Sequence, residues 1–254
     1  MTVREAIEVR KSVRTYKKEA VDSEIMARLR EMCREPRQCL PGQQARIVVI
    51  ERGLEGRVGT YGIISGAQCC LALVYRDVDG LSAVNAGMVM ENIVLWLTQQ
   101  SQGTCWLGGT FSRSNVTAAA SPAPDERIAA IVVLGIAADR ERLVARVMQK
   151  FAGSRRRRAF DDLFDIGDNR QWSPALELMR LAPSALNGQP WRAVAEGNAI
   201  HFFCTKPEGL GLLDTGIGLA HFAAGNDKPG KWETVGNAAS IRPEWRYVIS
   251  FLAE

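Results

Sequence analysis

Two arginines and a serine alternate near the N-terminus of the chain. Arg10, Ser12 and Arg14 stand two residues apart, so in an extended segment their side chains lie on one face. Each guanidinium donates hydrogen bonds in a fixed fork, and two of them beside a hydroxyl group suit a dianionic phosphate. The same residues also suit a solvated helix end, where cations interact favourably with the helix dipole. The spacing alone leaves both interpretations open.

A stretch in the second part of the chain carries neutral hydrogen-bonding side chains beside a large aromatic ring. The stretch RLAPSALNGQPWR runs from Arg180 to Arg192 and has no charged residue between these two arginines. Pro183 ends the preceding helical pattern and Pro190 has no backbone N–H to donate, so a rigid, extended loop is predicted. Exposed loops usually carry charged side chains. The composition of this loop therefore needs an explanation other than solvation.

Two further segments give weaker signals. In GTCWLGGTF (103–111), glycines surround Trp106 and could let backbone amides approach a planar ligand closely, although a turn after a buried strand is the favoured interpretation. The run SRRRR (154–158) is typical of a solvated face or a flexible linker. Nucleic-acid binding is an alternative, but interleaved aromatic residues, glycine-rich RNA motifs and zinc-finger spacing are absent from the sequence.

The sequence offers little for acid–base or nucleophilic catalysis by side chains alone. His201 lies in an apolar strand pattern and His221 in a helical one, and each is expected to be a core histidine. No Ser/His/Asp order, HExxH motif, phosphate-binding P-loop or GxGxxG stands out, and no metal site is predicted. Such a chain can still be an enzyme if a cofactor carries the chemistry.

Composition is that of an ordinary globular protein. The chain has 254 residues, 46% hydrophobic and 24% charged, with a net charge of +4, and its N-terminus lacks an apolar signal-peptide core. The most apolar region, 81–97, is interrupted by Glu91 and Asn92 and is expected to be too short to cross a membrane. Six cysteines without CxxC pairs or Cys/His ligand spacing are interpreted as reduced, mostly buried thiols of a cytoplasmic protein.

Helices and strands that would position these segments follow from capping residues and hydrophobic periodicity. Thr2 and Glu5 form a capping-box pattern, so a short helix opens the chain and delivers the Arg10–Arg14 segment at its end. Further helices are expected from 22 or 23 to 33 and over 82–102, 113–120, 139–151, 173–181 and 214–224. Strands are expected over 45–50, 69–75, 104–107, 127–135, 192–196, 199–203 and 245–252, with Gly197–Asn198 as a hairpin turn.

The pattern restarts after the arginine run, which indicates an internal repeat. Four pairs of segments match in the same order along the chain. They are 29–36 with 176–183, 39–50 with 185–196, 84–88 with 213–217, and 105–109 with 231–235. We infer two related helix-and-sheet halves, 1–150 and 165–254, joined by a basic linker at 151–164 and packed as the two subunits of a dimer pack.

Four segments together resemble the hallmark segments of the FMN-dependent nitroreductase superfamily. They are RKSVRTY (10–16), GTCWLGG (103–109), RRRAFDDLF (156–164) and APSALNGQPW (182–191). The resemblance implies an α+β, nitroreductase-like fold. In the usual order of that family the Pro-Ser-x-x-Asn loop follows the Arg-x-Ser-x-Arg segment closely, within one subunit of a homodimer. Here it comes some 170 residues later, which implies a branch in which two halves are fused in one chain as a pseudo-dimer.

The resemblance also implies an activity. The implied enzyme is an FMN-dependent oxidoreductase with two steps. NAD(P)H reduces the flavin and leaves, and a small-molecule acceptor such as a nitroaromatic compound or a quinone then takes the electrons. Alternatives are other flavin chemistry on the same scaffold, such as dehalogenation or flavin fragmentation, and a non-catalytic flavin- or nucleic-acid-binding module. One FMN per chain is expected, in a protein that works as a monomer without nucleic-acid or membrane partners. The first half's counterpart of the neutral loop, EPRQCLPGQQ (35–44), lacks the loop's small Ser-Ala pair.

Site residues follow from the resemblance residue by residue. Arg14 is expected beside the flavin N1/O2 edge, where a cation stabilises the charge that develops on reduction. Trp191 is expected to pack as core behind the neutral loop, and no side chain is assigned as a catalytic acid or base. The expected FMN-binding residues are Arg10, Lys11, Ser12, Arg157 and Arg158 for the phosphate, Leu107, Gly108 and Gly109 for the N5/O4 side, and Pro183, Ser184, Ala185, Asn187 and Gln189 for the ring edge and ribityl chain.

Overall fold

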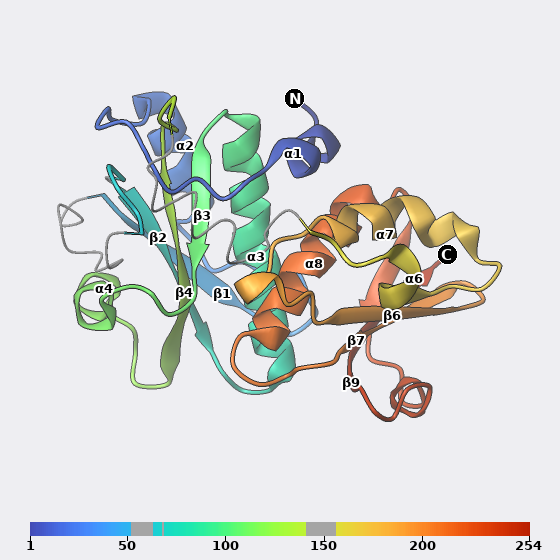
Figure 1. The fold of residues 1–254 in the computed structure, drawn as a ribbon. Helices are drawn as coiled ribbons and strands as arrows, with labels where there is room; N and C mark the ends of the chain where they lie inside the picture. The colour runs from blue at the N-terminus through green and yellow to red at the C-terminus, as the bar shows by residue number, and fades with distance from the viewer. Residues whose placement is uncertain (52–62, 68, 141–155) are drawn as a thin grey trace.

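A computed structural model describes residues 1–51, 63–67, 69–140 and 156–254. Its first sheet contains four antiparallel strands in the order β1-β2-β4-β3 (Figure 1). The strands are β1 (Ala45–Ile50), β2 (Cys69–Arg76), β3 (Gly103–Leu107) and β4 (Glu126–Gly135). Alternate residues of β2 lie in two separate core clusters, one against the long helix α3 and one against the short helix α4. The sheet is therefore covered on both faces, as its nearly continuous apolar sequence requires.

The second sheet has the order β5-β6-β7-β9-β8. Strand β5 pairs with β6 in parallel, and the other neighbours are antiparallel. The strands are β5 (Phe164–Asp165), β6 (Trp191–Glu196), β7 (Ala199–Cys204), β8 (Gly230–Glu233) and β9 (Arg246–Ala253). Apart from β5, the second sheet therefore has the same strand order as the first. In both sheets, β5 aside, the fourth strand along the chain lies between the second and the third.

The longest helices run side by side between the two sheets (Figure 1). They are α3 (Gly80–Gln99) and α8 (Gly211–Gly225), both largely buried. Helix α7 packs on α8 over the second sheet, and α1 packs on α3. The remaining helices are α1 (Val3–Val9), α2 (Ser23–Met32), α4 (Arg113–Ala120), α6 (Phe160–Leu163) and α7 (Ser173–Arg180), with 3-10 turns at Arg170–Trp172, Ala185–Asn187 and Ala238–Ser240.

The contact between α3 and α8 is reciprocal. A Cβ on Gly87 would lie 2.2 Å from the carbonyl oxygen of Leu213, and a Cβ on Gly216 would lie 1.9 Å from that of Val84. Glycine is needed at both positions because the two helix backbones touch there. In the repeat predicted from the sequence, 84–88 matches 213–217, so Gly87 is matched with Gly216 and Val84 with Leu213. The glycine of each helix therefore contacts the carbonyl oxygen of the residue that the match places three positions before the other glycine.

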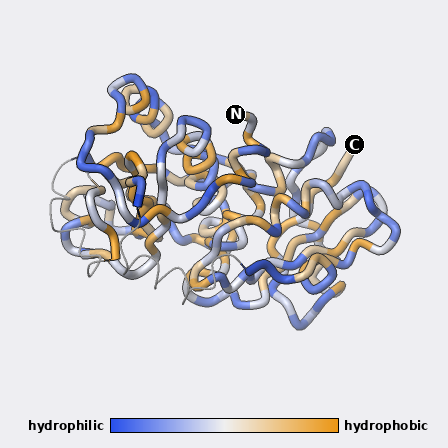
Figure 2. The backbone as a smooth tube through the Cα atoms, turned by 45° about the horizontal axis from the view of Figure 1, so that its top comes forward, coloured by the Kyte–Doolittle hydropathy of each residue, from blue (hydrophilic) through white to orange (hydrophobic). Residues whose placement is uncertain are grey.

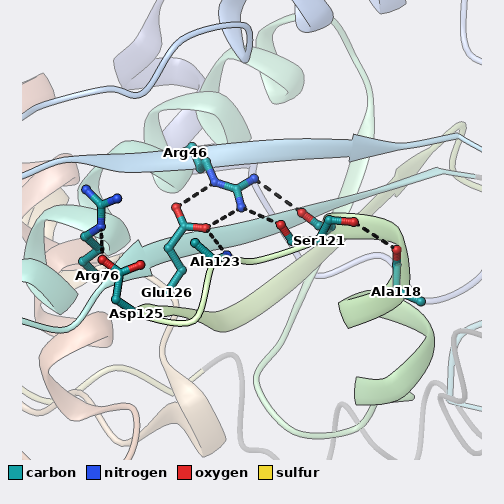
Figure 3. A network of polar contacts seen from close by, with 8 residues as sticks. Arg46, Arg76, Ala118, Ser121, Ala123, Asp125 and Glu126 are labelled. Carbon is teal, nitrogen blue, oxygen red and sulfur yellow. Dashed lines mark hydrogen bonds and ion pairs between the residues drawn. The ribbon is translucent and has the colours of Figure 1, made fainter.

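Polar and apolar residues separate as the strand and helix patterns require. In Figure 2 the interior segments are largely hydrophobic and the hydrophilic stretches lie mostly on outer loops. One partly buried polar network links two strands of the first sheet: Arg46 of β1 pairs with Glu126 at the start of β4, at 2.6 Å, and donates to the carbonyl oxygen of Ser121 (Figure 3). Ala123 donates its backbone N–H to the same carboxylate at 2.8 Å.

Most expected elements are found, and the differences have local causes. Strand β1 has the predicted bounds, whereas α3 begins two residues early because Asp79 and Ser82 form a capping box. Strands β5 and β8 were not predicted, since β5 has two residues and β8 has the mostly polar sequence GKWE. Most of the helix expected over 139–151 lies outside the described residues.

The expectation that the apolar region near position 90 is too short to cross a membrane was wrong on length. Helix α3 has 20 residues and is long and apolar enough to span one. Most of that helix is buried inside the protein, between the two sheets. The six cysteines are free thiols and five of them are buried, as predicted.

Candidate functional site

The Arg10–Arg14 segment leaves α1 and runs along β3. Helix α1 starts at the predicted capping box of Thr2 and Glu5 and ends at Arg10. Beyond it, Val13 donates its backbone N–H to the carbonyl oxygen of Thr104 at 2.8 Å, and Ser12 forms a parallel bridge with Thr104. The segment is therefore extended, which is the condition under which alternate side chains share a face.

The alternate side chains of this segment all interact with the thiol of Cys105. Burial raises the pKa of Cys105, while the charges of Arg14 and Arg10 and a hydrogen bond with Ser12 oppose the rise. Val13, on the opposite face, is buried against Gly103, where a Cβ would lie 3.0 Å from its side chain. The structure thus brings the two arginines and the serine together beside β3. The intervening Lys11 is exposed.

The neutral loop has a strained backbone. Leu186, Asn187 and Gln189 have φ angles of 50°, 56° and 47°, in the left-handed region that non-glycine residues rarely adopt. Such strain persists only where surrounding contacts enforce it, and it concentrates at functional sites. Ser184 accepts the backbone N–H of Gln189 at 3.0 Å, which closes the loop on itself. Trp191 is fully buried behind it, as predicted.

The amide side chains of this loop hold the basic segment. Arg157 donates to the Oδ1 of Asn187 at 2.9 Å and to the carbonyl oxygen of Leu181 at 3.0 Å. The Oε1 of Gln189 accepts the backbone N–H of Arg158 at 2.9 Å. Neutral hydrogen-bonding groups are therefore needed here to fix a cationic segment in place. This use of Asn187 and Gln189 differs from the expected role at a flavin ring edge.

The two neighbouring arginines of the basic segment are placed differently. Arg157 is partly buried and its guanidinium turns toward the neutral loop. Arg158 is exposed, takes part through its backbone, and repels Arg192 of β6. The structure therefore brings Arg157, and not the side chain of Arg158, into the vicinity of Arg10.

Two partly buried arginines interact electrostatically at this place. Burial, and then the charges of Arg10 and Arg180, lower the pKa of Arg157 to about 10. Burial also lowers the pKa of Arg10, which the charge of Glu91 only partly offsets. The Nε of Arg10 is buried and has no hydrogen-bond partner among the described residues. Like charges close together in a poorly solvated place favour the binding of an anion between them.

The glycine loop and the neutral loop meet at the first turn of α8. A Cβ on Gly108 would lie 2.2 Å from the side chain of Leu210, which directly precedes α8. Leu107 is buried, whereas Gly109 is exposed with no atom within 4 Å of a Cβ position. In the first turn of α8, Asp214 accepts the backbone N–H of Ala185 at 3.0 Å. The start of α8 therefore positions both loops.

Asp214 was not identified from the sequence. Burial raises the pKa of its carboxyl group to about 7, and the hydrogen bond from Ala185 opposes the rise. In the matching position of the first half, Asn85 accepts the backbone N–H groups of Cys39 at 2.8 Å and Leu40 at 3.0 Å. Cys39 corresponds to Ala185 in the repeat, so the two helices anchor equivalent loops. The match of 84–88 with 213–217 was a signal that could have identified this pair.

Two other buried ionisable residues lie behind the glycine loop. Glu91 of α3 is fully buried and contacts both Trp106 and His221. His221 is a core histidine, as predicted, and its ring forms a hydrogen bond with the carboxyl group of Glu91. The sequence signal for Glu91 was its charge within an apolar helix. Among the described residues no group of three or more His, Cys, Asp or Glu side chains could hold a metal ion.

Comparison with known proteins gives a family and a fold. A family model described as "Putative TM nitroreductase" matches residues 2–226. The "putative nitroreductase (tm1586)" of Thermotoga maritima is 21% identical, with a TM-score of 0.65 over 100% of this chain and 94% of its own. A structure of a nitroreductase with bound FMN from Bacteroides fragilis is 17% identical, with a TM-score of 0.44 over 56% of this chain and 91% of its own.

A nitroreductase family protein from Clostridium novyi is 18% identical, with a TM-score of 0.46 over 55% of this chain and 87% of its own. No curated protein matches the chain. The family model covers well over half of the sequence, and the Thermotoga structure shares the fold over the whole of this chain. The chain therefore belongs to the nitroreductase family that this model describes, and it is an enzyme of the nitroreductase type.

Proposed function

We propose that the chain binds FMN and uses NAD(P)H to reduce a small acceptor such as a nitroaromatic compound or a quinone. The observation that carries the proposal is the buried Nε of Arg10, which has no hydrogen-bond partner in the described part of the chain, together with the positive charge of the partly buried Arg157, whose pKa Arg10 lowers. A phosphate between them would supply the missing acceptor and about −2 of charge. Ser12 stands on the same face as Arg10 and offers a hydroxyl.

The residues of the site fit the remainder of the cofactor as well. FMN, when bound, accepts hydride from the reduced nicotinamide and passes electrons to the acceptor. Arg14 holds a fixed positive charge beside β3, and we place it at the N1/O2 edge, where it stabilises negative charge. Leu107, Gly108 and Gly109 offer backbone groups on the other side of the site. Ser184 and Ala185 close it from the loop that Asp214 anchors.

We also propose that the chain is an internal duplication that packs as a pseudo-dimer, with halves at 1–150 and 165–254. Three observations support it: the matching strand orders of the two sheets, the reciprocal contact of Gly87 and Gly216, and the equivalent loop anchors Asn85 and Asp214. An isologous interface has this property, since residue i meets residue j on both sides of the axis.

One FMN per chain follows from the differences between the halves. The second half has no counterpart of the Arg10-x-Ser12-x-Arg14 segment, and the first half has Arg37 and Pro41 in the loop that corresponds to the neutral loop. The symmetry-related place therefore lacks its phosphate ligands. We infer a protein that works as a monomer in the cytoplasm, without nucleic-acid or membrane partners. Sedimentation combined with flavin absorbance tests the ratio, and two flavins per chain would contradict it.

An absorbance spectrum of the purified protein, with and without NADH or NADPH, tests the proposed function. A flavin spectrum that is bleached anaerobically by either nicotinamide and restored by a quinone is the expected result. A flavin spectrum that neither nicotinamide changes would indicate other flavin chemistry or a flavin-binding module. A colourless protein that takes up no added FMN and shifts DNA in a salt-dependent way would refute the proposal.

A further inference from the structure

A buried polar network lies directly behind the candidate site. The indole Nε1 of Trp106 donates to the Oε2 of Glu91 at 2.7 Å, and the Nε2 of His221 lies 2.9 Å from the Oε1 of the same carboxyl group. The Nδ1 of His221 lies 3.1 Å from the carbonyl oxygen of Leu178. Glu91 and His221 are both fully buried. The network joins β3, α3, α8 and α7.

The hydrogen bonds determine how many protons the network holds. A carbonyl oxygen only accepts, so the Nδ1 of His221 carries a proton. A second proton must then lie between Nε2 of His221 and Oε1 of Glu91, because two facing lone pairs would repel. Whichever atom carries it, the pair has no net charge. Arg10, from the segment after α1, also interacts electrostatically with Glu91.

The repeat supplies an internal comparison for this network. With 84–88 matched to 213–217, the counterpart of Glu91 in α8 is Ala220, and that of His221 in α3 is Asn92. The counterpart of Trp106 is Trp232, so the indole is present in both halves. The helix pair therefore packs without an ionisable pair on one side and with one on the other. The ionisable pair occurs on the side that carries Arg10 and the glycine loop.

Stability alone does not explain a buried ionisable pair. Replacing such pairs by apolar residues is often neutral or stabilising, because removing the charges from water is costly. Ala220 occupies the matching position with 1% of its surface exposed. The features that distinguish the two sides are instead the hydrogen bond of Glu91 with Trp106 and its electrostatic interaction with Arg10.

We propose that Glu91 is a positioning residue of the cofactor site. It fixes the indole of Trp106, and with it the backbone of the adjoining Leu107–Gly109, while His221 ties the carboxyl group to α8. Helix α8 also carries Asp214, the anchor of the neutral loop, so the network holds the contributions of the two halves at a constant separation. This inference rests on the proposed FMN site.

FMN binding to the apoprotein, measured by quenching of flavin fluorescence, tests the proposal with three variants. Glu91→Ala introduces the residue found at the matching position and should weaken FMN binding about tenfold or more. Glu91→Gln should stay within about threefold of the wild type. The glutamine oxygen can accept from Trp106, and its amide can donate to a neutral His221. Trp106→Phe removes only the indole donor and should weaken binding in the same direction as Glu91→Ala.

A matched control separates positioning from general loss of stability. Glu126→Ala breaks the Arg46 network of Figure 3 at the start of β4, five residues before Ile131, the residue of β4 that pairs with Leu107. It should lower the melting temperature and leave FMN affinity unchanged. Glu91→Ala and Trp106→Phe combined should cost no more affinity than Glu91→Ala alone, because they remove the same contact.

The outcomes are distinguishable. If the wild type binds FMN and Glu91→Ala binds it equally well, the inference is overturned and the proposed function stands. If Glu91→Ala does not fold, Trp106→Phe decides, and wild-type affinity in that variant overturns the inference. A similar loss of affinity in Glu91→Gln and Glu91→Ala also contradicts it, since positioning needs the hydrogen bonds rather than the charge. A wild-type apoprotein that does not bind FMN overturns the proposed function and this inference together.

Discussion

Replacing Asp214 by asparagine should stabilise the protein in a pH-dependent way. Burial raises the pKa of this carboxyl group from 3.8 to about 7. A group whose pKa is higher in the folded state disfavours folding once it ionises, so wild-type stability falls between about pH 4 and pH 7. Since one pKa unit corresponds to about 1.36 kcal/mol, the loss is about 4 kcal/mol of unfolding free energy. The asparagine side chain of the variant would not titrate, and its oxygen could still accept the N–H of Ala185.

Urea unfolding at pH 5 and pH 8 measures the effect. The difference in unfolding free energy between Asp214→Asn and the wild type should be about 2–3 kcal/mol larger at pH 8, because part of the titration lies below pH 5. The reverse substitution, Asn85→Asp, places a carboxyl group at the matching position of the first half and should destabilise more at pH 8 than at pH 5. Equal effects of Asp214→Asn at both pH values would refute the reasoning, because the carboxyl group would then not titrate in this range.

Three further predictions concern the phosphate ligands and the helix contact. Arg10→Ala should weaken FMN binding by roughly 1.5–3 kcal/mol, or about tenfold to a hundredfold, and unchanged retention of flavin would refute its assignment. Arg157→Gln should release FMN more readily than Arg158→Gln, because only the first guanidinium turns inward, and equal small effects would restore the interpretation as a solvated linker. Gly216→Ala should lower the unfolding free energy by about 3 kcal/mol, since its Cβ would lie 1.9 Å from a carbonyl oxygen. Gly236→Ala is its control, because no atom lies within 4 Å of the added Cβ. An equal loss of unfolding free energy in both variants would contradict the close contact of Gly216 with α3.

Most helices and strands of the fold could be predicted from local sequence patterns. Strand β1 could be predicted to the residue because its sequence ARIVVI is rich in β-branched residues and lies between polar residues. The caps at Thr2 and Asp22 set the starts of α1 and α2. Strand β8 could not be predicted this way, because its short polar sequence forms a strand only by pairing with β9. Pairing between distant segments leaves no local signal.

The candidate site also has some features that follow from local sequence and others that depend on contacts between distant segments. Arg10, Ser12 and Arg14 could be assigned to one face because their alternation is local. The engagement of Gln189 with the basic segment, and of Asp214 with Ala185, depends on segments that are distant in sequence and meet only in the fold. Glu91 was visible as a charge in an apolar helix, but its partners come from β3 and α8.

The reciprocal contact of α3 and α8 has a consequence for how the molecule can be altered. In a symmetric homodimer every substitution at such a contact is made twice, so an added charge is always introduced in both subunits. Here the two helices belong to one chain, and equivalent positions already differ, as Glu91 and Ala220 or Asn85 and Asp214 do. In the proposed pseudo-dimer a charge, a bulky residue or a spectroscopic label can therefore be introduced in one half alone. The unmodified side then serves as a reference within the same molecule.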